Sequence, residues 1–408
     1  MPQLETQKPI SSLTRSELLS LAGVLIGVLL TYASTFTFGW VYDDPPQIPQ
    51  NPNLQWSRLG FLFTHQLWAS MSGSQGRFYR PFLSLWFLVN KTLFGLNPHW
   101  FHVTSVLAHV TATALAFFMA SRLLKDTGSA LLAAAVFGLH PLQAESASWI
   151  SSVNDPLAAA FCFASFLAYK KAAALQSSVV GWWALSGLLF LSALLTKEVS
   201  IVLPGIILID LWSKSLLHKS PSKPPTSPSS RFLVAIISTY GLAAALWLCL
   251  RTYALRGSTP ASSSLRWSTI VLTAPKILLF NLCRTIFPVG LSPHYDFRLI
   301  EAPSVQFLLT LLALLPLAAL AITAARRDPR LSTAFAWLIL PMLPTLDLRL
   351  MNEDDFIHDR YTYMSMLGVA LLAGFAYSCI RKKWPHLQLV RLLAAAIIVV
   401  LADRKSVV

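Results

Sequence analysis

Long apolar runs recur along the whole chain, and they constrain its fold more than any other feature. The first covers residues 19–40, LSLAGVLIGVLLTYASTFTFGW. About 20 apolar residues are needed for a helix to cross a hydrocarbon core about 30 Å thick. Lipid cannot satisfy backbone amides, so such runs cross as helices. Ten further runs share this character: 100–122, 129–142, 155–170, 179–196, 200–213, 232–250, 304–324, 331–347, 361–380 and 386–402. The sequence predicts an all-α polytopic membrane protein with about 11 transmembrane helices.

The charge content agrees with this class. Only 12% of the residues are charged, against about 25% in soluble domains. The net charge of +14 comes from basic residues grouped at the ends of apolar runs, as in cytoplasmic loops of membrane proteins. No basic stripe with interleaved aromatic residues is present, which argues against a nucleic-acid partner. The four cysteines lie in mostly apolar stretches without a CxxC pair, so we expect neither a disulfide nor a zinc site.

Basic loops also predict the orientation. The groups expected on the cytoplasmic side are Arg122 with Lys125, Lys170 with Lys171, residues 214–231, Arg326 with Arg327 and Arg330, and Arg381 with Lys382 and Lys383. Alternation from a cytoplasmic N-terminus fits only if residues 267–290 do not cross. That stretch contains Lys276, Asn281 and Arg284, so an interfacial or re-entrant helix is predicted there.

These considerations divide the chain into four parts. Residues 1–18 form a cytoplasmic segment, and residues 19–217 an N-terminal transmembrane module with a long outer loop at 41–99. Residues 218–230, HKSPSKPPTSPSS, are a Pro/Ser-rich cytoplasmic linker. Residues 231–408 form a C-terminal module. In the outer loop, HQLWASM and YRPFLSLWFLVNKTLF mix aromatic, basic and aliphatic residues, which predicts two short interfacial helices.

An acidic pair, Asp43 and Asp44, directly follows the first apolar run. Adjacent carboxylates repel each other, and partial burial raises the pKa of at least one of them. Such an aspartate can act as a general base or hold a divalent cation. The alternative is a pair of ordinary loop aspartates.

Two arginines, Arg77 and Arg80, lie three positions apart beside a predicted interfacial helix. Guanidinium groups match phosphate bidentately, so the pair is a candidate phosphate clamp. The alternative is that both side chains extend to lipid headgroups.

The segment HPLQAESASWISSVNDP joins two predicted spans and contains His140, Glu145, Asn154 and Asp155. If a helix continues here, Glu145 and Trp149 share one face. A carboxylate and an indole together suit a sugar, whose hydroxyls need acceptors and whose apolar face stacks on aromatic rings. Helix capping is the alternative for His140, and an N-cap before proline is the alternative for Asp155.

Further candidates lie at the remaining outer loops. Lys197 and Glu198 form a charged pair near the hydrocarbon, either functional or a structural ion pair within a helical hairpin. His294 and Tyr295 follow another apolar stretch. Arg360 and Tyr361, at a bilayer boundary after an acidic run, are candidates for binding phosphate or headgroups.

The order of these motifs resembles the membrane half of the TMTC-type proteins, which are related to protein O-mannosyltransferases and other GT-C glycosyltransferases. The motifs are VYDD, YRPFLSLWF, FGLNPHWFHVTSVLAH, FGLHPLQAESASWISSVNDPLAA, TKEVSIVLPGIILIDLW, FPVGLSPHYDF and HDRYTYMSMLG. The resemblance covers about residues 20–375. Two departures from the family pattern are expected: the absence of tetratricopeptide repeats after residue 402 and a more acidic loop before Arg360.

The resemblance implies an inverting GT-C glycosyltransferase that takes a sugar, typically mannose, from a polyprenyl-phosphate carrier on the outer face. It assigns the catalytic base to Asp43, with Asp44 beside it. It assigns the second acidic loop to Glu145, with His140 and Asp155. Lys197, Arg80 and Arg360 are expected near the lipid phosphate. Many family members work without a metal, so a divalent cation at the Asp43/Asp44 pair is not required.

The predicted partners are a polyprenyl-phosphate sugar donor, an acceptor protein or glycan, and the lipid bilayer. A protein serine or threonine is one candidate for the acceptor hydroxyl. A lipid-linked-sugar transporter or flippase, and a non-catalytic membrane scaffold, are the alternatives. A transporter would carry polar residues near span midpoints. The loop set favours a bacterial inner membrane over the endoplasmic reticulum.

Overall fold

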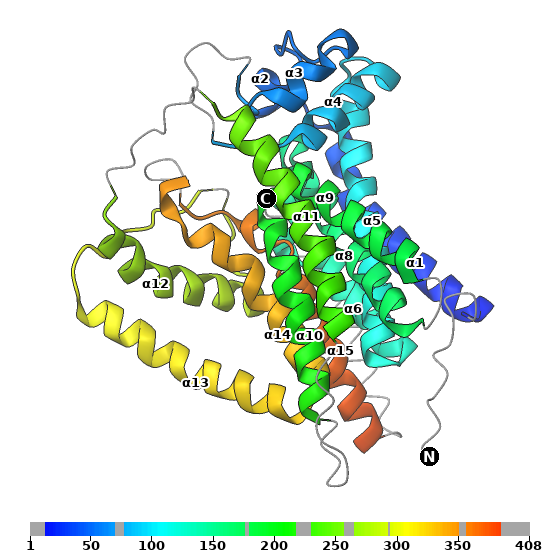
Figure 1. Ribbon diagram of the computed structural model, residues 1–408, viewed down its shortest axis with the longest axis vertical. Coiled ribbons are helices and arrows are strands. Elements are labelled where there is room, and N and C mark those ends of the chain that lie inside the picture. Colours follow the sequence, from blue (N-terminus) through cyan, green and yellow to red (C-terminus); the bar gives the residue numbers. More distant parts are fainter. Residues whose placement is uncertain are drawn as a thin grey trace.

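The computed structural model describes residues 13–69, 77–175, 179–217, 230–256, 265–292, 294–350 and 356–384 (Figure 1). Every regular element in these ranges is helical, which confirms the predicted all-α class. Residues 1–12, the linker residues 218–229, the acidic run 352–355 and the predicted span 386–402 lie outside the described residues.

The first half of the chain forms a packed set of long helices. They are α1 (Arg15–Tyr32), α5 (Pro98–Leu124), α6 (Thr127–Leu139), α8 (Asn154–Ala174), α9 (Val179–Thr196) and α10 (Leu203–Leu217). Small residues let these helices approach closely, as is usual where lipid gives no hydrophobic drive for association. Gly138 shows the constraint, because a Cβ there would lie 2.6 Å from Val28 and 2.8 Å from Thr113. The α1–α5–α6 contact therefore requires glycine.

The second half contributes α11 (Ser230–Ala254), α12 (Trp267–Ile286), α13 (Val305–Arg327), α14 (Pro329–Ile339) and α15 (Met366–Lys383). Helix α15 packs against α6, α11 against α9, and α14 against α10. At Gly374 of α15, a Cβ would lie 2.7 Å from the Ser129 carbonyl oxygen of α6. The two predicted modules thus share one core.

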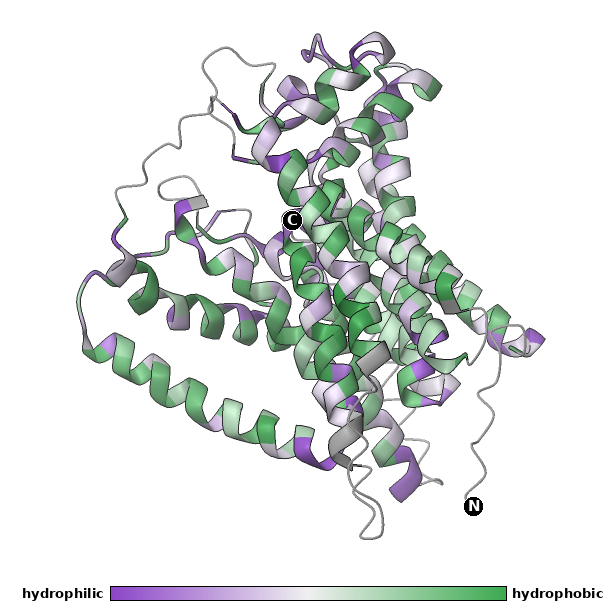
Figure 2. Ribbon diagram, in the orientation of Figure 1, coloured by the Kyte–Doolittle hydropathy of each residue, from purple (hydrophilic) through white to green (hydrophobic). Residues whose placement is uncertain are grey.

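Each of the ten predicted spans in the described part of the chain coincides with a helical segment. Six stretches there are long and apolar enough to cross a membrane: Arg15–Thr37, Pro98–Leu124, Ile150–Ala174, Phe232–Ala254, Trp267–Ile286 and Val305–Arg327. Figure 2 shows apolar residues along the outside of α13, where Leu308, Leu312 and Leu320 are each about 60% exposed. Exposed leucine rows of this kind suit contact with lipid, and the chain is an integral multi-pass membrane protein.

One end of the bundle gathers several of the basic groups predicted to be cytoplasmic. The turn between α5 and α6 contacts the first helix, α1, and the last described helix, α15. Thr127 donates to Glu17 at 2.6 Å, and Arg381 at the end of α15 pairs with Asp126. On the same side, Lys170 of α8 pairs with the fully buried Asp210 of α10 at 3.1 Å.

The first outer loop lies beyond the opposite end of the bundle (Figure 1). It contains α2 (Asp44–Gln47), α3 (Leu59–Thr64) and α4 (Pro81–Phe94). Helix α4 coincides with the second predicted helix, and its interfacial position remains a prediction. The first prediction is wrong, since the helix precedes HQLWASM. The Gln66 side chain accepts the Trp68 N–H at 2.7 Å, and the Leu67 N–H donates to the Phe78 carbonyl at 2.8 Å, so these residues form a turn.

Helix α12 is one continuous 20-residue helix, which excludes a re-entrant pair of half-helices and is compatible with the other predicted alternative, an interfacial helix. Its length and hydropathy would allow it to cross the membrane, but in Figure 1 it runs across the view while α10 and α11 run along it. Arg284, which argued against burial, lies against protein and pairs with Asp359 at 3.3 Å. The interfacial orientation remains a prediction.

Candidate active site

The first outer loop is tied to the second through Asp44. This residue is fully buried, and its Oδ1 accepts the main-chain N–H of Ser151 at 2.8 Å and the Ser151 hydroxyl at 2.5 Å. Its Oδ2 accepts the Val41 N–H at 3.0 Å. Burial raises the pKa of Asp44, and these hydrogen bonds oppose the rise. Asp44 therefore acts as a structural anchor.

Asp43 differs sharply from its neighbour. It is half-buried and stands at the N-cap of α2, where it makes no side-chain capping bond to that helix. The anchor at Asp44 fixes the backbone on which Asp43 is presented. The carboxylate of Asp44 is engaged in the hydrogen bonds that hold the loop. This arrangement is compatible with the base role predicted for Asp43.

The second outer loop consists of short helical turns between α6 and α8. His140 is buried, and its Nδ1 accepts the Leu142 N–H at 3.3 Å, which supports the capping interpretation. Asn154 donates from Nδ2 to the Ser151 carbonyl at 3.3 Å. Asp155 is not an N-cap, because α8 already begins at Asn154. Its carboxylate is instead engaged with a distant lysine.

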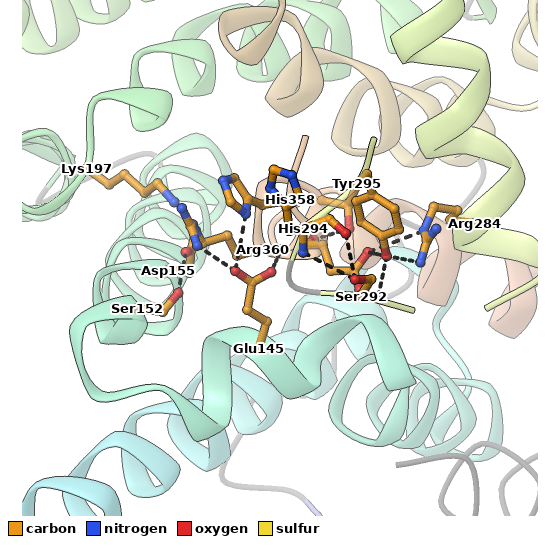
Figure 3. A network of polar contacts seen from close by, with 12 residues as sticks. Glu145, Ser152, Asp155, Lys197, Arg284, Ser292, His294, Tyr295, His358 and Arg360 are labelled. Atoms are coloured by element: carbon orange, nitrogen blue, oxygen red, sulfur yellow. Dashed lines mark hydrogen bonds and ion pairs between the residues drawn. The ribbon is translucent and has the colours of Figure 1, made fainter. Parts of the chain in front are cut away.

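That lysine is Lys197, which directly follows α9. Its Nζ donates to Asp155 Oδ1 at 2.5 Å, while the Ser152 hydroxyl donates to Oδ2 at 3.3 Å (Figure 3). Burial lowers the pKa of Lys197, and Asp155 counteracts this. The pair links the second outer loop to the α9–α10 connection.

Glu198 binds a different cation. Arg80, at the start of α4, donates to it from Nε at 3.0 Å and from Nη2 at 2.5 Å. Burial favours a raised pKa for Glu198, but Arg80 outweighs it and lowers the pKa to about 2. The alternative interpretation of Lys197 and Glu198 as a structural ion pair with each other is thus wrong. Arg77 takes part in this cluster with its main-chain carbonyl, which accepts a hydrogen bond from Arg251 of α11 at 3.1 Å.

Arg360 completes the row of cations. Its Nη1 donates to Glu145 Oε1 at 2.5 Å, and its main-chain N–H donates to Oε2 at 2.9 Å. Its guanidinium lies 4.8 Å from the Trp149 ring centroid and 5.4 Å from that of Tyr361. Lys197 Nζ lies 5.8 Å from the same Tyr361 ring. Helix α7 (Ala144–Ser148) ends before Trp149, so Arg360, rather than a shared helical face, joins Glu145 to Trp149.

Tyr295 belongs to an adjoining cluster. Its hydroxyl donates to Asp359 Oδ1 at 2.9 Å and accepts from Arg284. Burial raises the pKa of Asp359 to about 6, although Arg284 opposes the rise. His294 is exposed, and its carbonyl accepts the Ser292 hydroxyl at 2.6 Å.

The clusters form a continuous band. Figure 3 shows Lys197, Asp155, Arg360, Glu145, His358, Tyr295 and Arg284 in one row. Among the described residues, four cation–carboxylate pairs meet here: Arg80–Glu198, Lys197–Asp155, Arg360–Glu145 and Arg284–Asp359. Each cation is held in place by a carboxylate from another segment of the chain.

Sequence reasoning missed several of these residues. Asp359 was part of a quoted motif but was given no role, and Arg284 was considered only as an obstacle to spanning. Ser151 carries no distinctive signal. Arg251 had one, since a basic residue directly after a span on the outer side departs from the usual charge distribution.

The predicted cation at Asp43 and Asp44 finds limited support in the donor set. Asp44 already accepts three hydrogen bonds, and within the described ranges no group of three or more His, Cys, Asp or Glu side chains is arranged to hold a metal ion. Mg²⁺ can bind through one or two carboxylates and substrate phosphates, which Asp43 would permit. The cation remains a prediction.

Comparison with known proteins finds relatives of the chain. No protein family model matches the chain. It is 26% identical over 408 residues to protein O-mannosyl-transferase TMTC1 of Homo sapiens, covering 86% of this chain and 45% of that protein. It is 31% identical over 205 residues to protein O-mannosyl-transferase Tmtc1 of Drosophila melanogaster, covering 49% and 23%. The resemblance to the TMTC proteins is confirmed. The chain spans less than half the length of these TMTC relatives.

A solved structure confirms the fold that the TMTC resemblance implied. It is the archaeal oligosaccharyltransferase AglB from Archaeoglobus fulgidus, in complex with an inhibitory peptide and a dolichol-phosphate. The match has a TM-score of 0.52 at 15% identity and covers 96% of this chain and 56% of that one. The chain has the GT-C fold.

Proposed function

We propose that this chain is a membrane glycosyltransferase that moves mannose from a polyprenyl-phosphate carrier to an acceptor hydroxyl, that of a protein serine or threonine. The observation that carries the proposal is the bond between Asp44 and Ser151. It joins the turn that carries Asp43 to the loop that bears Glu145 and Asp155. This junction supports the assignment of a general base and a row of cations to one site.

The reaction needs these two kinds of group on opposite sides of the sugar. The acceptor hydroxyl loses its proton to the Asp43 carboxylate, and its oxygen bonds to C1 of the sugar. The bond from C1 to the phosphate oxygen breaks, and its electron pair stays on the phosphate. Attack opposite to the leaving group inverts C1. A positioned base contributes about 10²–10⁴-fold to such a step.

The cations stabilise the charge that develops on the departing phosphate. Lys197 uses one of its three donors on Asp155, and Arg360 uses its Nη1 on Glu145, so each keeps further donors for phosphate. The carboxylates hold the cations before substrate arrives, and such preorganised donors need no rearrangement during the reaction. Arg80, backed by Glu198, and Arg251 extend the row toward the outer loop.

The comparisons support the same proposal. The relatives are named protein O-mannosyl-transferases, and the AglB structure with the same fold contains dolichol-phosphate and a peptide. A polyprenyl-phosphate donor and a protein acceptor for this chain follow by analogy. The alternatives, transport and scaffolding, have no comparable support.

Transfer in a defined bilayer tests the proposal. The purified chain in nanodiscs would receive polyprenyl-phosphate [³H]mannose and peptides rich in serine and threonine, with and without EDTA. We expect label on peptide hydroxyls. Loss of the activity in EDTA and its return with Mg²⁺ would assign the cation. Movement of the donor between leaflets of vesicles without peptide labelling would contradict the proposal and favour a transporter.

A further inference from the structure

The turn before α2 has an unusual centre. The Asp44 N–H donates to the Val41 carbonyl at 2.9 Å, so Tyr42 and Asp43 are the central residues of a tight turn. Tyr42 has a φ of 49°, in the left-handed region. In β-turns a central position with positive φ is normally occupied by glycine, asparagine or aspartate. A tyrosine there is strained by about 1–2 kcal/mol.

No helix end explains this strain. Within the described ranges, the non-glycine residues with positive φ are Tyr42 and Lys125, and Lys125 is the C-cap of α5, where the left-handed conformation is common. The side chain of Asp44 holds the turn instead, because it accepts the N–H of Val41 across the turn and the N–H of Ser151 from the second outer loop. Strain that the surroundings maintain in this way is frequent at functional sites.

The Tyr42 ring at this strained position is exposed and not buried in the protein. The residue is 75% exposed, yet its ring packs edge-on against Trp149, with centroids 5.8 Å apart. Trp149 in turn lies under the Arg360 guanidinium. Tyr42, the chain neighbour of Asp43, thus contacts Trp149, and Trp149 contacts Arg360.

We infer that Tyr42 and Trp149 form an aromatic shelf that binds the pyranose ring of the donor. The inference rests on the proposed function and adds the recognition of the sugar to it. In an inverting reaction the acceptor and the leaving phosphate lie on opposite sides of C1, so the sugar must occupy the space between base and cation. The two rings connect the turn that carries Asp43 to Arg360, and the apolar face of a hexose stacks on aromatic side chains.

A membrane anchor would also use exposed aromatic residues. Phe38 and Val41 nearby are exposed, and such residues favour the bilayer boundary. An anchor does not require a strained turn or contact with a ring that carries the guanidinium of Arg360. The shelf accounts for both features.

Two substitutions at Tyr42 distinguish the contribution of the ring from that of the strained backbone. Tyr42→Gly removes the ring and relieves the strain, so the turn is expected to persist. Tyr42→Phe keeps the ring on the same strained backbone. The readouts are the KM for polyprenyl-phosphate mannose and the inhibition constant of the sugar-free polyprenyl phosphate, which competes for the phosphate site alone.

For Tyr42→Gly we expect the donor KM to rise about tenfold, with the inhibition constant of the sugar-free carrier unchanged. In the separate variant Tyr42→Phe, which keeps the ring, the donor KM should stay within about twofold of the wild-type value. An unchanged donor KM in Tyr42→Gly, or an equal rise in both constants, would overturn the shelf and leave the proposed function standing. Absence of any transfer by the wild-type chain would remove both.

Discussion

Asp44 and Ser151 are 107 positions apart in the chain, yet the serine donates both its N–H and its hydroxyl to one carboxylate oxygen, at 2.8 and 2.5 Å. This contact joins the two outer loops that carry the acidic residues. Because Asp44 is fully buried, the contact is protected from water. It sets the position of the turn that presents Asp43.

Removing the Ser151 hydroxyl should loosen this junction. Hydrogen bonds to charged groups contribute about 1.5–3 kcal/mol, so Ser151→Ala is expected to lower the free energy of unfolding by about 2 kcal/mol. The measurement is unfolding in mixed detergent and SDS micelles. Ser192→Ala is the matched control, since its hydroxyl bonds to the Leu188 carbonyl of its own helix. Equal stability of the two variants would exclude the anchoring role.

Charge removal at Lys197 should weaken phosphate binding. Lys197→Met deletes the ammonium that pairs with Asp155, and the affinity for polyprenyl phosphate is expected to fall at least about tenfold, the effect of losing about 1.4 kcal/mol. Lys91→Met makes the same change in the outer loop, where Lys91 binds the Leu54 carbonyl, and should leave this affinity unaltered. Scintillation proximity with labelled carrier measures both. Matching affinities would show that Lys197 is structural.

The buried ion pair between Lys170 and Asp210, at the other end of the bundle, should contribute to the free energy of unfolding and not to transfer activity. Asp210 is fully buried and accepts from Lys170, Tyr169 and Thr333. Breaking a buried pair by removing one partner typically destabilises by about 3–5 kcal/mol, and Asp210→Asn is expected near the lower limit. Asp328→Asn provides the comparison on the same side, because it disrupts the more exposed pair with Arg330 and should cost less than about 1 kcal/mol. Similar losses in both variants would contradict this account.

Asp359 should give stability a distinct pH dependence. Its pKa is about 6 in the folded chain and 3.8 as an ordinary aspartate, so the folded state binds the proton more tightly. The resulting stabilisation is complete below about pH 3.8 and is lost as the pH rises through about 6. Between pH 7 and pH 4 the wild type should therefore gain Tm relative to Asp359→Asn. Parallel Tm curves for the two proteins would show that this carboxyl does not titrate there.

The sequence was sufficient to predict the helices, since an apolar run of suitable length has few other structures available in lipid. It also predicted which loop ends carry the polar residues, including Asp44, Lys197 and Arg360. The pairing among them could not be predicted. Lys197 and Glu198 are neighbours, yet they bind Asp155 and Arg80 respectively, because side chains in successive positions of a turn point in different directions.

Distant contacts also determine the surroundings of two residues whose local patterns did not reveal their partners. Arg284 argued against a membrane-spanning helix, and the sequence did not show that Asp359 and Tyr295 bind its guanidinium. Asp155 before a proline had the pattern of an N-cap, and the helix begins one residue earlier. In both cases the local pattern is real, but a contact from a distant segment determines the outcome.

The most direct test of the account is a single-turnover transfer rate for Asp43→Asn, which leaves the size of the side chain unchanged and removes its basicity. We expect the rate to fall by about 10²–10⁴-fold while affinity for polyprenyl phosphate stays the same. Asp296→Asn, an exposed aspartate of another outer loop, should retain the wild-type rate. A rate for Asp43→Asn close to that of wild type would contradict the assignment of the base.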